Sequence, residues 1–535
     1  MMDLTKKKRY LFSLLSGILM VASFPFTGSL TPLVFISWIP LLLIEQNIST
    51  KKYRSSKVFI HALIVFLLYN IGTTWFIWNA SAGGAIFAIG LNGLIMAFVF
   101  YLFHLFRKKF PSKWSYAILL LTWISFEYIH FNWDLSWPWL NLGNVFSITP
   151  SLVQWYSITG IEGGTLWILT ANILLFLLLP KLKFKTIDWK FPRKEVGLFA
   201  AVLVVPILFS LFFYYSYSEK IDPVEVVTLQ PNIDPYNEKF TSDLKPQLDK
   251  LFALADEAVT PKTKFIIAPE TSLSATFFEE EIKGLDFYKY ILERKANWHN
   301  ASLYIGASTV KFFETKNSNV SRKLEGGPGY IESYNSSLLI DELNRSEIVH
   351  KSKLVLGVEK LPFTTIFPQL EEMAINLDGA SGSLGIEKEA RTLHANEITF
   401  APSVCYESIY GDFISKQVKK GAELIFIITN DGWWGDTPGY KQHASFARLR
   451  AIENRRSIAR SANTGISCII NQRGDVLQET GWWVPAVLKA DLNKNNEQTF
   501  YAQQGDWLGK LCLYLMIGFL AFLFTRRVQG FFSKS

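Results

Sequence analysis

Long apolar segments constrain the fold of this chain more than any other feature. They fill most of the first 220 residues and return once near the C-terminus, so that 49% of the 535 residues are hydrophobic. A run of about 20 apolar residues is the length that crosses a bilayer as a helix. The sequence therefore predicts a polytopic α-helical membrane protein with about eight spans, at 10–25, 31–45, 57–78, 84–106, 114–131, 162–180, 197–217 and 508–525. The first two are short, and a re-entrant pair is the alternative for them.

Positive charge is concentrated between these apolar ranges. Of the 54 Lys and Arg residues, 21 lie in the short stretches 6–9, 51–57, 107–113, 181–194 and 526–534, whereas loops 24–31 and 79–83 have none. Loops rich in Lys and Arg stay in the cytoplasm. We therefore expect both termini and the basic loops on the cytoplasmic side of a bacterial inner membrane. The net charge of +8 then reflects topology, and no nucleic-acid partner is expected.

The range between the seventh and eighth apolar segments has ordinary globular composition. Seven spans before it place it on the periplasmic face. Strand-like and helix-like patterns alternate there, which favours a layered α/β domain. Strands are expected at 224–230, 264–269, 302–308, 336–340, 347–353, 398–404, 423–429 and 466–471, and helices at 242–258, 283–298 and 440–460. The expected domains are 1–220 (membrane, about seven helices), 221–503 (soluble) and 504–535 (last helix and cytoplasmic tail).

Three reactive side chains stand at the ends of strand-like runs in the soluble range. Cys405 follows the apolar run 398–404, and Glu270 and Lys351 end two further runs. Taken singly, they could be a buried cysteine, a surface ion pair and a solvated lysine. Together they supply a nucleophile, a base and a cation, which acyl transfer through a thioester needs.

Other residues of these types have simpler interpretations. Cys468 and Cys512 lie in apolar runs and are expected to be buried hydrophobic residues. Lys353, on the same strand face as Lys351, is an alternative cation. His443 lies in an Arg-rich helical stretch and is expected to be a structural hydrogen-bonding residue. The histidines and cysteines show no metal-ligand spacing, so no metal is expected.

The outside loop 131–140 is dense in tryptophan. An aromatic belt at the membrane interface is one interpretation. The other is that Trp137 and Trp139 line an entry for a lipid chain.

The three reactive residues stand in motifs that resemble those of a known superfamily. Glu270 in Ala-Pro-Glu-Thr, Lys351 in His-Lys-Ser-Lys-Leu-Val and Cys405 in Val-Cys-Tyr-Glu match, in order, the Glu–Lys–Cys motifs of the carbon–nitrogen hydrolase (nitrilase-like) superfamily. A closer resemblance, to the membrane-embedded apolipoprotein N-acyltransferase family, covers nearly the whole chain and rests also on segments 137–140 with Gly143, 430–436, 442–444, 448–453 and 461–465.

The resemblance implies a soluble domain of nitrilase-like α-β-β-α sandwich type. It also implies an enzyme that moves an acyl chain from a phospholipid to the α-amino group of a diacylglyceryl-modified apolipoprotein. Glu270 would take the Cys405 proton, and Lys351 would stabilise the oxyanion. No cofactor is implied. Supporting roles are implied for Glu359, Tyr406 and Glu407, and possible substrate contacts for Trp139, Phe240 and Trp433.

The chain departs from the family pattern at two places. Leu356-Gly357-Val358 stands where the family usually reads Pro-Phe-Gly, although the spacing from Lys351 to Glu359 is kept. Phe240 stands near the place where the family tends to have Trp.

Three other functions compete with this interpretation. A membrane-anchored amidohydrolase would use water as the acceptor, but eight spans are many for an anchor. A transporter would need charged residues inside its spans, and the spans are expected to lack them, with Glu127, His130 and His104 near span ends. A scaffold without activity would not need all three triad residues.

Overall fold

The computed structural model describes residues 4–110, 112–181, 192–364, 366, 367, 369 and 383–532. The chain divides into two compact units, Met1–Tyr215 with Asp506–Ser535, and Ser216–Gly505. Four residues of the predicted basic stretches, Lys183, Lys185, Lys190 and Lys534, lie outside the described residues.

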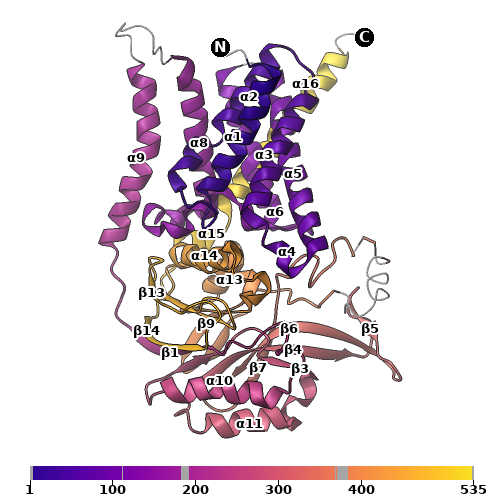
Figure 1. Cartoon of the computed structure of the whole chain (residues 1–535), viewed down its shortest axis with the longest axis vertical. Helices are drawn as coiled ribbons and strands as arrows, with labels where there is room; N and C mark the ends of the chain where they lie inside the picture. The colour runs from indigo at the N-terminus through magenta and orange to yellow at the C-terminus, as the bar shows by residue number, and fades with distance from the viewer. Residues whose placement is uncertain are drawn as a thin grey trace. The chain divides into compact units, whose positions relative to one another are not determined.

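The first unit is helical, and each range predicted to span a membrane overlaps one of its longer helices (Figure 1). Its longer helices are α1 (Lys6–Ser23), α2 (Ile39–Thr50), α3 (Ser56–Thr74), α5 (Ala82–Lys109), α6 (Ala117–Phe131), α8 (Ile161–Leu178), α9 (Arg193–Ser216) and α16 (Trp507–Phe532). The short helices α4 (Ile77–Ala80) and α7 (Tyr156–Thr159) and several 3-10 turns connect them.

Six helical segments among the described residues are long and apolar enough to cross a membrane: Thr31–Thr50, Ser56–Thr74, Ala82–Lys109, Ile161–Lys181, Arg193–Ser216 and Trp507–Arg526. Helix α6 is apolar but has only 15 residues. Helix α1 has 18 and begins with four basic residues. These features make the chain a membrane protein with several apolar helices.

Helix α9 shows how a backbone carbonyl left without its usual hydrogen bond finds another donor. Pro206 lies inside it and has no N–H to donate to the carbonyl of Val202, four residues earlier. The indole Nε1 of Trp167 in α8 donates to that carbonyl instead, at 2.7 Å. A second contact joins Ser210 Oγ to the carbonyl of Ser151 at 2.7 Å.

The expectation that the spans lack charged residues is wrong. Glu45 in α2 is fully buried and accepts hydrogen bonds from His104 Nδ1 at 2.6 Å and Arg107 Nη2 at 2.7 Å. Glu127 and Glu162 are also buried, in α6 and α8. A charge in an apolar environment needs such partners, and here the partners join neighbouring helices together.

The second unit contains two β-sheets. The larger has the strand order β14-β1-β2-β4-β6-β5, with β3 beside β4 and β7 beside β6; the smaller has β13-β12-β11-β10-β9-β8. In the larger sheet the strands are β1 (Pro223–Gln230), β2 (Phe265–Ile267), β3 (Leu273–Phe278), β4 (Ser302–Phe313), β5 (Arg322–Lys323), β6 (Tyr330–Ile340), β7 (Ser346–His350) and β14 (Ala486–Asn493). In the smaller they are β8 (Leu393–Ala395), β9 (Ile398–Val404), β10 (Leu424–Thr429), β11 (Ile458–Ala462), β12 (Cys468–Ile470) and β13 (Val476–Glu479).

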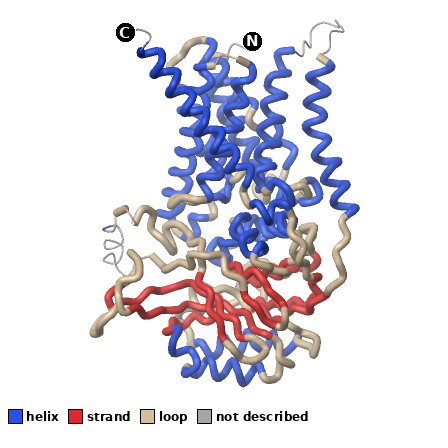
Figure 2. Tube along the Cα trace, turned by 180° about the vertical axis from the view of Figure 1, so that it is seen from behind, coloured by secondary structure: helices blue, strands red, loops and turns tan. Residues whose placement is uncertain are grey.

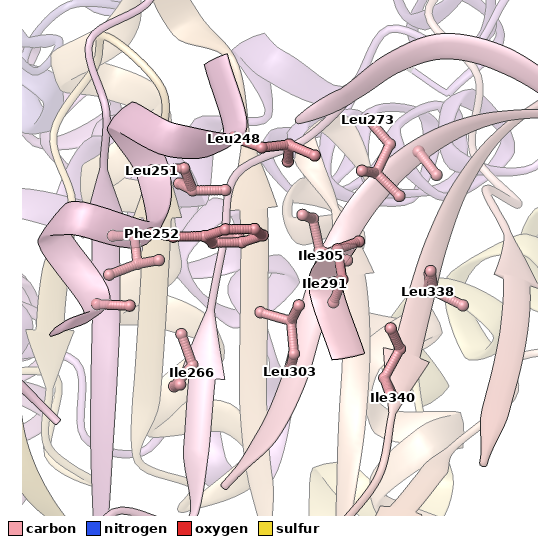
Figure 3. Close-up of a cluster of buried hydrophobic side chains, with 14 of the residues drawn as sticks. Leu248, Leu251, Phe252, Ile266, Leu273, Ile291, Leu303, Ile305, Leu338 and Ile340 are labelled. Carbon is pink, nitrogen blue, oxygen red and sulfur yellow. The ribbon is translucent and has the colours of Figure 1, made fainter. Parts of the chain in front are cut away.

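Helices cover the outer faces of both sheets. Helices α10 (Leu244–Ala258) and α11 (Asp286–Lys295) lie on the larger sheet, where Phe252 and Leu251 of α10 pack against Ile266 and Leu303 of the strands (Figure 3). Helices α13 (Gly411–Lys419) and α14 (Pro438–Asn454) pack on the smaller sheet.

A second apolar core lies between the two sheets. Phe265 of β2 makes edge-to-face contacts with Phe400 of β9 and Phe426 of β10, with ring centroids 5.5 and 5.1 Å apart. Side chains that alternate along the strands therefore face a helix layer on one side and the partner sheet on the other. The predicted α-β-β-α sandwich is confirmed (Figure 2).

Several element boundaries differ from the prediction. The helix expected at 440–460 ends at Asn454, because Arg455 takes a left-handed φ of 49° and the buried strand β11 follows. Strands β4 and β6 extend beyond the predicted ranges 302–308 and 336–340, since they form a long antiparallel pair. Strands β3, β5, β8, β11, β13 and β14 and helix α13 were not predicted.

Candidate active site

The candidate residues stand at the carboxyl ends of parallel strands. Glu270 follows β2, which is parallel to β1 and β4, and Cys405 follows β9, which is parallel to β10. Lys351 comes directly after β7, which pairs antiparallel with β6. Side chains after the ends of neighbouring strands meet at one edge of a sheet. Glu270 and Lys351 belong to the larger sheet and Cys405 to the smaller, and the packing of the two sheets brings these edges together.

Lys351 lies between two carboxylates. Its Nζ is 3.2 Å from Glu270 Oε1 and 2.8 Å from Glu359 Oε1, and its side chain is fully buried. Asn335 Nδ2 donates to the same two oxygens, at 2.8 Å and 2.9 Å. Glu270 and Glu359 therefore share one ammonium and one amide donor, which hold the two carboxyl groups close together.

Backbone groups fix the other oxygen of each carboxylate. The N–H of Asn430 donates to Glu270 Oε2 at 3.0 Å, and the N–H of Val355 donates to Glu359 Oε2 at 2.8 Å. Glu359 thus joins the predicted triad residues in space. Gly357 takes a φ of +83°, a backbone conformation that favours glycine, so the displaced glycine of this sequence fits the turn leading to Glu359.

Cys405 has a strained backbone. Its φ is +53°, which a residue with a Cβ rarely adopts. Ser408 Oγ donates to its carbonyl at 2.7 Å, and His443 Nε2 lies 3.2 Å from the same oxygen. The surrounding contacts therefore hold the cysteine in this turn between β9 and the next segment, with its side chain partly exposed.

Glu407 joins the cysteine turn to the lysine segment. Its Oε2 accepts from the N–H of Val404 at 2.7 Å, and its Oε1 accepts from the N–H of Ser352 at 2.5 Å. Burial raises the pKa of Glu407 to about 7, although these backbone donors act in the opposite direction. Tyr406 is buried, and its ring makes an edge contact with Tyr410.

Electrostatics separate the roles of the cation and the thiol. Burial lowers the pKa of Lys351, but the charges of Glu359 and Glu270 outweigh it and raise the pKa well above the usual value. Lys351 is therefore a permanent ammonium. Burial and the Glu270 charge raise the pKa of the Cys405 thiol, whereas Lys351 lowers it. A thiol of this kind reacts only when a base takes its proton in the reaction step.

The alternative cation, Lys353, lies elsewhere. Its Nζ is 5.1 Å from the centre of the Tyr410 ring, and burial lowers its pKa. Among the described residues, neither Glu270 nor Glu359 forms a salt bridge with it. Lys351 is thus the lysine that the structure brings to the carboxylates.

A buried ion-pair network stands behind the cysteine. Asp431 Oδ2 accepts from Arg460 Nη2 at 2.6 Å, and Asp431 Oδ1 is 2.9 Å from His443 Nδ1. Burial raises the pKa of Asp431, but Arg460 and His443 outweigh it and hold the pKa well below its usual range. His443 is therefore a structural hydrogen-bonding residue, as expected, that connects this network to the Cys405 backbone.

One group of side chains could hold a metal ion by geometry. Ligand atoms of Cys405, Asp431 and His443 lie within 4.8 Å of one another. No spacing of residues in the sequence indicated this group, because the three residues come from separate elements. Asp431 already carries the Arg460 guanidinium at hydrogen-bond distance, and that cation would repel a divalent ion.

Two of the three candidate substrate contacts lie together. Phe240 is 54% exposed and stacks on Trp433, with ring centroids 6.2 Å apart and an angle of 17°. Tyr236 adds an edge contact to Trp433 at 5.3 Å and donates to its carbonyl. The third candidate, Trp139, belongs to the other unit, where it is 1% exposed and stacks on Trp137.

Sequence reasoning missed Asn335, Asn430 and Lys239. Lys239 Nζ donates to the backbone carbonyl of Glu270 at 2.8 Å. Asn430 opens the segment 430–436, so the motif contained a signal for it. Asn335 lies inside β6 among serines, one residue before the predicted strand 336–340, and nothing in the local sequence distinguished it. Cys468 and Cys512 are buried, as expected.

Comparisons with known proteins agree with this arrangement. Residues 226–501 match the carbon-nitrogen hydrolase family, and residues 16–174 match the apolipoprotein N-acyltransferase N-terminal domain.

Curated relatives extend over both regions. An apolipoprotein N-acyltransferase of Chlorobaculum tepidum is 29% identical over 95% of each chain. One of Geobacter metallireducens is 26% identical over 96% of this chain and 94% of its own, and one of Haemophilus influenzae is 27% identical over 98% and 95%. The chain therefore belongs to the carbon–nitrogen hydrolase family, with the N-terminal domain that characterises the apolipoprotein N-acyltransferases.

Proposed function

We propose that this protein is an N-acyltransferase that moves a fatty acyl chain from a phospholipid to the α-amino group of a diacylglyceryl-modified apolipoprotein. The proposal is supported by relatives of that name over nearly the full chain. The observation that carries the chemistry is the buried Lys351, held between Glu270 and Glu359, in a site that also includes the strained Cys405 turn.

The first half-reaction forms an acyl-enzyme. Glu270 takes the proton of the Cys405 thiol as the sulfur attacks the ester carbonyl of the phospholipid. Lys351 and backbone N–H groups stabilise the oxyanion of the tetrahedral intermediate. The intermediate collapses to a thioester, and the leaving lysophospholipid alkoxide takes the proton from Glu270.

The second half-reaction transfers the acyl chain. The free α-amino group of the apolipoprotein attacks the thioester, and Glu270 accepts a proton from the nitrogen. Collapse forms the amide and releases the Cys405 sulfur, which regains its proton. Glu359 and Glu407 position Lys351. Glu359 accepts a hydrogen bond from the Lys351 ammonium, and Glu407 accepts one from the backbone N–H of the next residue, Ser352.

The exposed aromatic side chains suit an acyl substrate. Phe240, Trp433 and Tyr236 form an apolar surface in the unit that contains the triad. Aromatic faces of this kind bind hydrocarbon chains by apolar burial. In the helical unit, Trp137 is the candidate for contact with lipid, and Trp139, which is 1% exposed, stacks on it.

The proposed setting is a bacterial inner membrane. The helical unit would be the membrane domain, with the basic stretches in the cytoplasm, and Ser216–Gly505 would be the periplasmic catalytic domain.

Intact-mass analysis of the purified full-length protein tests the chemistry. After incubation with phospholipid, we expect a mass increase of one fatty acyl group, which is absent in Cys405→Ala and retained in Cys468→Ala. A lipopeptide with a free amino group should remove the adduct and appear as its acylated form. Discharge by water alone would support the amidohydrolase instead. No adduct that depends on Cys405 would refute the thioester mechanism.

A further inference from the structure

Lys239 is a buried lysine that the proposed mechanism does not use. Lys239 is 1% exposed, and its Nζ donates to the backbone carbonyl of Glu270 at 2.8 Å. The Phe240 ring lies 5.9 Å from the same Nζ. An ammonium buried with one backbone acceptor is unusual, because lysine normally keeps its charge in water.

The segment that carries Lys239 is rigid. The Asp234 carbonyl accepts from the N–H groups of Glu238 at 3.1 Å and Lys239 at 2.9 Å, which closes a short turn. Gln247 Nε2 of α10 donates to the Lys239 carbonyl at 3.0 Å. The lysine side chain is therefore held in place from both sides of its backbone.

This turn joins two parts of the site. Lys239 contacts the backbone of Glu270, while the next residue, Phe240, is exposed and stacks on Trp433. Displacing the lysine would therefore move both the proposed base and the aromatic surface. Consecutive residues thus connect the apolar surface to the reacting groups.

The charge of Lys239 also acts on the reacting groups. Burial lowers the pKa of Lys239 to about 7, while the charges of Glu270, after β2, and of the Cys405 thiolate, after β9, raise it. Interaction between two groups is mutual, so a protonated Lys239 favours the thiolate as much as the thiolate favours the ammonium. Lys351 contacts Glu270 through the carboxylate, whereas Lys239 contacts it through the backbone.

We propose that Lys239 is a positioning residue of this site, which fixes the backbone of Glu270 and places a second positive charge near the Cys405 sulfur. The inference deepens the proposed function, and it rests on Cys405 being the reactive thiol. It does not depend on which acceptor receives the acyl chain.

The rate of Cys405 alkylation by iodoacetamide tests the inference without any lipid substrate. Full-length protein in detergent is treated between pH 6 and pH 10, and the modified Cys405 peptide is measured by mass spectrometry. Lys239→Met should lower the rate about fivefold at pH 6, where Lys239 with its pKa of about 7 is protonated, and the two profiles should converge above pH 8. Lys239→Arg should recover most of the rate.

Two further variants separate charge from fold. Lys239→Gln keeps a donor for the Glu270 carbonyl but has no charge, so it should show the same loss of rate at pH 6 as Lys239→Met. Lys295→Met removes another buried lysine of this unit, whose Nζ donates to Asn344 Oδ1 at 3.2 Å, and should leave the profile unchanged. A wild-type profile in Lys239→Gln, or an equal loss in Lys295→Met, would overturn the proposed charge effect.

Phospholipid acylation of the same samples keeps the two proposals apart. If Lys239 variants change the alkylation profile in this way but the parent protein forms no acyl adduct, the acyltransferase proposal fails and the role of Lys239 stands. If the parent is acylated and Lys239→Gln alkylates normally, the acyltransferase proposal stands and the inference about Lys239 is wrong.

Discussion

At the residue scale, the site depends on one lysine shared by two carboxylates. Glu270 and Glu359 both use their Oε1 atoms for Lys351 and Asn335. One ammonium and one amide group therefore hold two carboxyl groups at the same place. Removing the cation would leave two acidic groups facing each other in a buried site.

We therefore expect Lys351→Met to abolish activity and weaken the fold. Loss of one oxyanion donor typically lowers a rate by about 10²- to 10³-fold. Breaking a buried ion pair costs about 3–5 kcal/mol of unfolding free energy. Time courses of the acyl adduct by intact mass, with thermal unfolding in detergent, measure both effects. Lys353→Met is the matched control, and an equal loss of acylation there would contradict the assignment of Lys351.

Glu407 gives the unit a pH-dependent stability. Burial raises its folded pKa from 4.5 to about 7, so the folded state binds this proton more tightly than the unfolded state. Its contribution to stability is full below pH 4.5 and is lost as the pH rises through about 7. The loss is roughly 3 kcal/mol by the relation between pKa and free energy.

Glu407→Gln should therefore flatten the stability profile between pH 4.5 and pH 7. The amide cannot titrate, but it still offers one oxygen to the N–H of Val404 or Ser352. Thermal unfolding of the full chain across this range measures the slope. If the variant keeps the slope of the parent protein, another group is responsible for it.

At the element scale, sequence patterns predicted the framework better than the strand pairing. The apolar ranges gave the long helices because segments of about 20 apolar residues have few alternatives. Strand ends at 270, 351 and 405 were also evident from composition. The edge strands β13 and β14 were missed because their partly exposed, mixed sequences resemble loops.

The site residues divide in the same way. Glu270, Lys351, Cys405 and Glu359 come from motifs with fixed spacing, and the structure brings the three charged residues into contact. Asn335 was hidden because the pairing of β6 with β4 and β7 brings it to the site, where the Lys351 N–H donates to its carbonyl at 2.8 Å. Contacts between distant strands leave little trace in a single sequence.

The approach of β4 to the segment after β2 predicts the effect of a small substitution. A Cβ at Gly306 of β4 would overlap Thr271 N and lie 2.5 Å from Glu270 Cα. The backbone of Glu270 would have to move, and a shift of this size at a base lowers rates strongly. We expect Gly306→Ala to lower the acylation rate at least about tenfold.

Gly284→Ala is the control for this substitution. It lies in the same unit, and a Cβ there has nothing within 4 Å among the described residues. It should acylate at the parental rate. Normal acylation of Gly306→Ala, measured by intact mass, would show that the backbone of Glu270 tolerates displacement.

At the scale of the whole molecule, the first helical unit is completed by the last helix of the chain. Glu162 at the start of α8 is fully buried, and its Oε2 accepts from the N–H of Gly509 in α16 at 2.7 Å. The unit is therefore closed by a contact between residues 347 positions apart in the sequence. A buried carboxylate at a helix N-terminus is also favoured by the helix dipole.

Gly509→Ala should loosen this closure. A Cβ there would overlap the Glu162 carboxylate and lie 2.7 Å from the Cβ of Tyr128, so α16 would have to move outward. Overpacking of this kind typically costs about 1–3 kcal/mol. Thermal unfolding should show a lower midpoint for Gly509→Ala than for Gly518→Ala, the same substitution in the same helix with open space around it. Equal midpoints would mean that the contact does not stabilise the unit.

The proposed orientation makes a prediction about labelling. Ala80 and Lys51 are both exposed, in the charge-free and basic loops that follow α3 and α2. In cells with a permeabilised outer membrane, a membrane-impermeant maleimide should label Ala80→Cys in the periplasm but not Lys51→Cys in the cytoplasm. Lysis should make both react, while the parent protein, whose cysteines are buried or partly buried, reports the background. The opposite result, with Lys51→Cys labelled before lysis and Ala80→Cys protected, would mean that the topology is inverted. The charge bias sets the orientation of all the short loops together, so Cys405 would then lie in the cytoplasm.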